Sequence, residues 1–137
     1  MREILFRGKD IKGNWYEGLL AHNISKDEWY ISNKAGISTA YQVRSETIGQ
    51  FTGLTDKNGV KIFEGDIVEY ETGKKVRIGR VFFSDFRASF SVTAGKNGSA
   101  RINNDLFNYI QNRNSVIVIG NIYDNPELIG GADNENS

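Results

Sequence analysis

Two carboxylates near the middle of the chain have the residue types for acid–base chemistry or metal binding. Glu64 and Asp66 stand on either side of Gly65. A pair of carboxylates can share acid and base roles in a hydrolase, or bind a divalent cation. Carboxylates in tight turns more often accept hydrogen bonds from backbone N–H groups. We therefore favour a structural role for both residues, and a hydrolase built on them is the least favoured function.

Two other polar stretches and the single histidine also have a structural and a functional interpretation. Asp56-Lys57-Asn58-Gly59 is similar to the start of a calcium loop, but later ligands are missing at the required spacing, so we expect a hairpin turn. His22 is the only histidine, and no spacing motif supplies it with an orienting partner and a nucleophile, so we expect a histidine in a loop. The amide-rich stretch Gly120–Pro126 is expected to satisfy backbone groups in a fixed turn rather than to bind a ligand.

The composition excludes several kinds of chemistry. The chain has no cysteine, which removes thiol nucleophiles, disulfides and cysteine-bound metals. It has no glycine motif of the strand–loop–helix type that holds phosphates. We therefore predict no catalytic residues, no metal and no cofactor.

Basic residues are concentrated in one part of a formally neutral chain. Residues 74–113 hold 8 Lys and Arg against 2 Asp and Glu, a net charge of +6, whereas the whole chain has 17 of each. A strand bulge at Gly79 would turn several of these side chains to one side, around an exposed Phe82. A solvated face, or a cationic face against a neighbouring subunit, is favoured because the charges can pair. The possible contacts for an anion or nucleic acid are Lys75, Arg77, Arg80 and Arg87, and the wider basic set adds Lys74, Lys96 and Arg101.

Aromatic side chains are frequent, at 12% of the residues. Four of them lie close together in the first quarter of the chain, and strand alternation prevents all four from facing a core. Exposed aromatic clusters usually mark interfaces. The expected homo-oligomer contacts are therefore Trp15, Tyr16, Trp29 and Tyr30.

Short apolar runs, 15 glycines and a single proline indicate a mainly β domain of antiparallel hairpins. One short helix is expected at Asn103–Gln111, with Asn103 or Asn104 as its N-cap. Val116–Tyr123 is expected to form a central strand or a subunit contact. Residues 130–137 are expected to form a disordered tail. The other expected strands are Glu3–Arg7, Trp15–Leu20, Trp29–Ser32, Thr39–Val43, Thr47–Phe51, Val60–Phe63, Ile67–Tyr70, Lys75–Ser84 and Phe86–Thr93.

Four segments give the chain a family resemblance. They are FRGKDIKGNWYEG (Phe6–Gly18), TIGQFTGLTDKNGVKIFEGDIV (Thr47–Val68), GRVFF (Gly79–Phe83) and VIGNIYDNPELI (Val118–Ile129). With these, the chain resembles the YopX family of bacteriophage and prophage proteins. The resemblance implies a phage or prophage origin and a mainly β fold with an SH3-like small barrel. It implies no activity, so no catalytic residues are carried over.

These observations lead to one leading function and two alternatives. We expect a single β domain over residues 1–129, with the barrel portion at about 53–129, acting as a non-enzymatic, homo-oligomeric binding module toward a host or phage protein. The first alternative is an oligomer that sequesters a small anionic or nucleotide ligand through Arg77, Arg80 and Arg87. The second is nucleic-acid binding through the basic face of residues 74–101. No apolar run approaches the ~20 residues of a membrane span, so no membrane association is expected and the cytoplasm of the bacterial host is the expected location.

Overall fold

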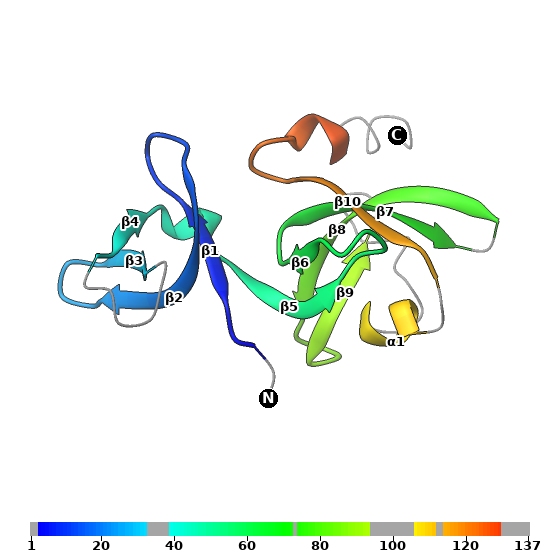
Figure 1. The fold of residues 1–137 in the computed structure, drawn as a ribbon, viewed down its shortest axis with the longest axis horizontal. Coiled ribbons are helices and arrows are strands. Elements are labelled where there is room, and N and C mark those ends of the chain that lie inside the picture. The colour runs from blue at the N-terminus through cyan, green and yellow to red at the C-terminus, as the bar shows by residue number, and fades with distance from the viewer. Residues whose placement is uncertain (1–2, 33–38, 73, 94–105, 112–113, 130–137) are drawn as a thin grey trace. The chain divides into compact units, whose positions relative to one another are not determined.

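The computed structural model describes residues 3–32, 39–72, 74–93, 106–111 and 114–129. The chain divides into two compact units, Met1–Gly53 and Leu54–Ser137 (Figure 1). Described strands form two antiparallel sheets, in the orders β4-β3-β2-β1-β5-β6 and β10-β7-β8-β9. The mainly β prediction is confirmed. Among the described strands no barrel closes, so the SH3-like barrel stays a prediction, as does the single-domain assignment. The tail over 130–137 lies outside the described residues.

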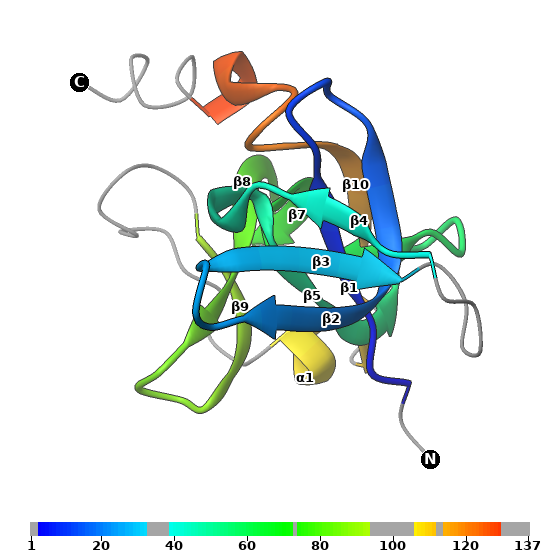
Figure 2. The ribbon, with the colours of Figure 1, turned by 90° about the vertical axis from the view of Figure 1, so that its left-hand side faces the viewer.

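The first unit is a meander that curls back on its first strand. The N–H of Arg44 donates to the carbonyl of Lys9 at 2.8 Å, which joins the end of β4 to β1. A Cβ on Gly8 would lie 2.9 Å from the side chain of Val43, so glycine lets these strands meet. Figure 2 shows β2, β3 and β4 side by side. The elements are β1 (Phe6–Lys9), β2 (Trp15–Asn23), β3 (Glu28–Ser32), β4 (Tyr41–Val43), the 3-10 helix η1 (Ser45–Thr47) and β5 (Gly49–Thr55), of which the residues after Gly53 belong to the second unit.

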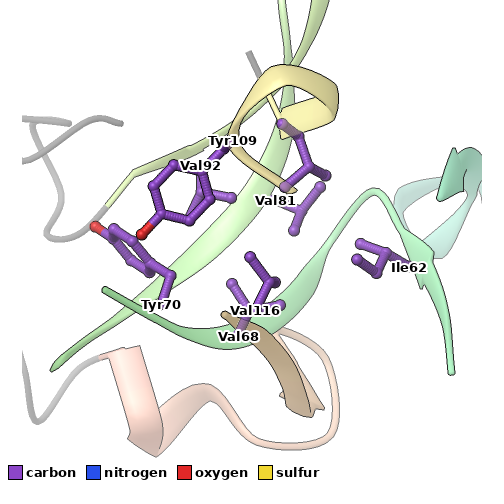
Figure 3. Close-up of a cluster of buried hydrophobic side chains, with 8 residues drawn as sticks. Ile62, Val68, Tyr70, Val81, Val92, Tyr109 and Val116 are labelled. Carbon is purple, nitrogen blue, oxygen red and sulfur yellow. The ribbon is translucent and has the colours of Figure 1, made fainter. Parts of the chain in front are cut away.

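The second unit contains the larger apolar core. Its strands are β6 (Lys61–Phe63), β7 (Asp66–Thr72), β8 (Lys75–Ser84), β9 (Ser89–Thr93) and β10 (Val116–Asn121), with the helix α1 at Leu106–Gln111. Figure 3 shows how the rings of Tyr70 and Tyr109 close one end of this cluster, with an edge-to-face contact at 6.3 Å between centroids. The buried members are Ile62, Val68, Tyr70, Val81, Val92, Leu106, Tyr109 and Val116.

The expected bulge at Gly79 is wrong. β8 keeps an unbroken register with β7, where Val68 pairs with Gly79, and with β9, where Arg80 pairs with Thr93. Gly79 serves close packing instead, since a Cβ there would lie 2.6 Å from the carbonyl oxygen of Thr93 and 2.8 Å from the ring of Tyr70. The register shift lies in β10, between Val118 and Gly120.

Among the described strands β10 lies at an edge of its four-stranded sheet. Of the two interpretations of Val116–Tyr123, the central strand is therefore wrong and the subunit contact stays a prediction. The outer side of β10 is not left open, because the turn after β5 hydrogen-bonds to it. The helix is confirmed at its C-terminal end, whereas the expected N-caps Asn103 and Asn104 lie outside the described residues.

Candidate functional site

The turn Asp56–Gly59 is held by one buried carboxylate. Oδ1 of Asp56 accepts from the N–H groups of Asn58 (2.8 Å) and Val60 (2.9 Å), which shapes the turn. Oδ2 accepts from the N–H of Val118 at 2.9 Å, and the N–H of Lys57 donates to the carbonyl of Val116 at 3.0 Å. Asp56 is 6% exposed. Both carboxylate oxygens thus bind backbone, and the hairpin-turn interpretation is confirmed over the calcium loop.

Asp66 has a comparable structural role. Its Oδ2 accepts from the N–H of Phe63 at 2.7 Å, and the residue is 2% exposed. Gly65, at φ +92°, donates to the carbonyl of Val81 and accepts from the N–H of Ile122, both at 2.9 Å. The turn between β6 and β7 is therefore connected to β8 and to the chain after β10. In the described ranges, no three His, Asp or Glu side chains converge to form a metal site.

The amide-rich stretch after β10 also satisfies its own backbone. Oδ1 of Asn121 accepts from the N–H groups of Tyr123 (3.0 Å) and Asp124 (2.9 Å). Asn125 approaches so closely that a Cβ on Gly120 would lie 2.5 Å from its Oδ1. These contacts agree with the structural interpretation of Gly120–Pro126.

The possible anion contacts do not share one face. Strand alternation puts Lys75 and Arg77 on one face of β8 and Arg80 on the other, because the register contains no bulge. Arg87 lies in the turn Asp85–Ala88 between β8 and β9. Phe82 is half-buried rather than exposed. Lys75, Arg80 and Arg87 are exposed and Arg77 is half-buried, while Lys96 and Arg101 lie outside the described residues.

The four expected oligomer-contact aromatics are half-buried, and two point to each face of the first sheet. Lys9 pairs with Trp15 and Gly8 with Tyr16, so these neighbours face opposite ways, as do Trp29 and Tyr30. Each has a partner within the chain. Tyr16 stacks on Tyr41 with 4.2 Å between the ring centroids, and Trp29 stacks on His22 with 3.8 Å between them. The guanidinium of Arg7 lies 5.0 Å from the Trp15 ring, and the hydroxyl of Tyr30 donates to Glu28 at 3.1 Å.

His22 contacts one of these aromatic residues and a carboxylate. Its Nε2 lies 2.9 Å from Oδ1 of Asp27, and its ring stacks on Trp29. Asp27 is strongly exposed, in the turn between β2 and β3. The histidine thus supports the hairpin of β2 and β3. It lies in strand β2, so the loop position expected from the sequence is wrong.

Sequence reasoning missed two adjoining pockets in the second unit. The first, with a volume of about 280 Å³, lies between the Asp56 turn, Ile110 of α1 and Val116 of β10. The second, of about 220 Å³, includes the carboxylates Glu69 and Glu71. Lys57 and Ser115 line both. No motif marks them, because the lining segments lie some sixty residues apart in the sequence and meet only through packing.

A second missed feature is the tip of the β8–β9 hairpin. Phe86 is 94% exposed, and Phe83 beside it is 43% exposed and packs edge to face on Phe90 at 5.3 Å. Hairpin turns usually carry glycine or small polar residues. The sequence therefore favoured a strand from Phe86 to Thr93, whereas β9 begins only at Ser89 and Phe86 lies in the turn.

Comparisons with known proteins assign the family. A crystal structure of protein EF1440 from Enterococcus faecalis is similar, with 28% identity and a TM-score of 0.55 over 94% of this chain and 99% of that one. No curated protein matches the sequence. No helix in the described ranges has the length and apolar content that crossing a membrane requires. The model of the YopX protein family matches residues 6–130. The chain therefore belongs to the YopX family.

Proposed function

We propose that this protein is a non-enzymatic phage or prophage binding protein that acts as a homo-oligomer in the bacterial cytoplasm. The observation that carries the proposal is a contrast between buried polar groups and exposed apolar ones. Asp56 and Asp66 accept backbone hydrogen bonds inside turns. Several large apolar side chains point into solvent instead, with Phe86 at 94%, Ile11 at 87%, Ile24 at 82% and Val76 at 66% exposure. Exposed aromatic and aliphatic groups are what an association surface needs.

Gel filtration with light scattering tests this proposal. A mass that is an integer multiple of 15.4 kDa, kept on dilution, is expected. Ser substitutions of Trp15, Tyr16, Trp29 and Tyr30 should then show which half-buried aromatic residues contribute to assembly. A monomer across the whole concentration range contradicts homo-oligomerisation. A host or phage protein captured by the oligomer, and lost in an assembly-defective variant, identifies the binding partner.

Binding of an anionic ligand is the second candidate, favoured by the exposure of Lys75, Arg80 and Arg87. A ligand that binds only the folded protein raises its melting temperature, so a panel of nucleotides is the direct screen. For nucleic acid, affinity must fall steeply with salt, and each lost phosphate contact should reduce that dependence. Arg80→Ala and Lys75→Ala test opposite faces of β8 separately. If no nucleotide raises the melting temperature and no salt-dependent binding of nucleic acid is seen, binding of an anionic ligand is excluded.

The SH3-like barrel is the structural part of the proposal. Its support is the contact between the turn after β5 and the outer edge of β10, where Lys57 and Asp56 hydrogen-bond to Val116 and Val118. That contact covers the outer edge of β10, as a closing barrel would require. An experimental structure that includes residues 94–105 tests closure. Hydrogen bonding continued around the strands supports a barrel, and an open edge at β9 contradicts it.

A further inference from the structure

The tip of the β8–β9 hairpin carries a pattern of charged and apolar side chains. Asp85, Phe86 and Arg87 follow each other at the turn and all three are exposed. Phe86 is 94% exposed, so it fills no pocket of its own chain. The turn is ordered, since Oγ of buried Ser84 accepts from the N–H of Arg87 at 3.2 Å and Ala88 holds φ at +51°. An aromatic side chain on an ordered turn has only two rotatable angles to fix, so it loses little conformational entropy on binding.

The two adjoining pockets carry the complementary pattern. The first is lined by the aliphatic side chains of Ile110 and Val116, and its volume is about 280 Å³. A cavity of about 150 Å³ accommodates benzene, so a phenyl ring fits. Lys57 lies at both pockets, and the second adds the carboxylates of Glu69 and Glu71. From one pocket to the next, the surface therefore offers an apolar recess, a cation and then anions.

We infer that the Phe86 tip of one copy docks into the Lys57 pockets of a second copy. The phenyl ring enters the recess formed by Ile110 and Val116. Asp85 pairs with Lys57, and Arg87 pairs with Glu71 beside Glu69. This inference rests on the proposed homo-oligomer and names one pair of surfaces within it. An aromatic anchor in a pocket, flanked by charge pairs, is the usual arrangement of a strong interface contact.

A mixing experiment tests the contact. Phe86→Ser removes the tip ring and Ser115→Trp fills the pockets, while each variant keeps the other surface. We expect each variant alone to associate at least tenfold more weakly than the wild type, and the two mixed to form a 1:1 pair. Ile24→Ser is the matched control, because Ile24 is 82% exposed at a different hairpin turn. Its assembly should equal that of the wild type. Circular dichroism melting verifies that each variant folds.

Charge exchange provides a second test that does not require Ser115→Trp to fold. Asp85→Lys and Lys57→Asp should each weaken assembly, and the double variant should restore it. A monomeric wild type overturns the homo-oligomer itself. A wild type that assembles, with Phe86→Ser assembling equally well, overturns only the docking contact. Failure of the double variant to recover, with the single variants weakened, overturns the pairing of Asp85 with Lys57 and with it the assigned orientation.

Discussion

The carboxylate of Asp56 and the backbone N–H of Val118 form a 2.9 Å hydrogen bond across 62 residues of sequence. It connects the turn after β5 with the edge strand β10, and it is reinforced by the bond from Lys57 N–H to Val116. Edge strands need a cover for their unpaired backbone groups. The Asp56 turn provides that cover, and it also brings Lys57 to the two pockets.

Asp56 substitutions should therefore destabilise the second unit in graded fashion. Asp56→Ala leaves three partly buried backbone N–H groups without their acceptor. A loss of about 3 kcal/mol is expected, because one hydrogen bond to a charged group contributes roughly 1.5–3 kcal/mol and water can reach part of these donors. Asp56→Asn can keep the two bonds at Oδ1 and should lose less. Amide hydrogen exchange distinguishes them: Val118 should exchange faster in both variants, Asn58 and Val60 only in the alanine variant. Unchanged exchange at Val118 in both contradicts the role of this bond.

Gly79 should not tolerate a side chain. Gly79→Ala puts a methyl group against the carbonyl of Thr93 and the ring of Tyr70, and overpacking of this kind costs about 1–3 kcal/mol. The neighbouring Arg80→Ala changes an exposed side chain and should stay within about 0.5 kcal/mol. Urea unfolding of both variants measures the difference. Equal stability of Gly79→Ala and the wild type would mean that β7 and β9 are less closely packed at this point.

The same glycine shows where sequence reasoning reached its limit. The bounds of β8 were predicted correctly, because Lys75–Ser84 is a long run of β-forming residues between turns. A glycine inside a strand indicates either a bulge or a close approach of another group. Choosing between them requires Tyr70 and Thr93, whose positions depend on the pairing of three strands. The predicted common face for the basic residues depended on the wrong choice.

The same limit applies to the candidate site, where local contacts could be predicted from the sequence and long-range contacts could not. Local chemistry was predictable: Asp56, Asp66 and Asn121 bind nearby backbone, and side-chain parity separated Trp15 from Tyr16. Long-range partners were not predictable from the sequence. The stacking of Tyr16 on Tyr41, for example, depends on how β4 is placed in the sheet. The Lys57 pockets likewise form from segments that no motif connects.

Thr47 should matter for the first unit through its hydroxyl. Oγ1 accepts from the N–H of Lys9 at 2.9 Å and donates to the carbonyl of Arg44 at 2.6 Å, and the residue is 1% exposed. Thr47→Val keeps the shape and removes the acceptor of the Lys9 N–H, while the carbonyl of Arg44 keeps its hydrogen bond from the backbone N–H of residue 47. A loss of about 1–3 kcal/mol is therefore expected. Thr47→Ser keeps the hydroxyl and should lose clearly less. Thermal unfolding compares them, and a valine variant as stable as the serine variant excludes this role of the hydroxyl.

Asp10 should make the first hairpin sensitive to acid. Hydrogen bonding, mainly from the Asn14 N–H at 2.8 Å and further from Tyr16 and Lys12, lowers the pKa of the Asp10 carboxyl below its ordinary value. Because the folded-state pKa is depressed, the stabilisation is present above the unfolded pKa of about 3.9 and is lost as the pH falls through the folded value. An NMR titration of the carboxyl carbon should give a midpoint below about 3.9, and Tyr16→Phe should raise it by removing one donor. The stability difference between the wild type and Asp10→Asn should be largest near neutral pH and shrink in acid. A midpoint at or above the ordinary value in the wild type rules out this coupling.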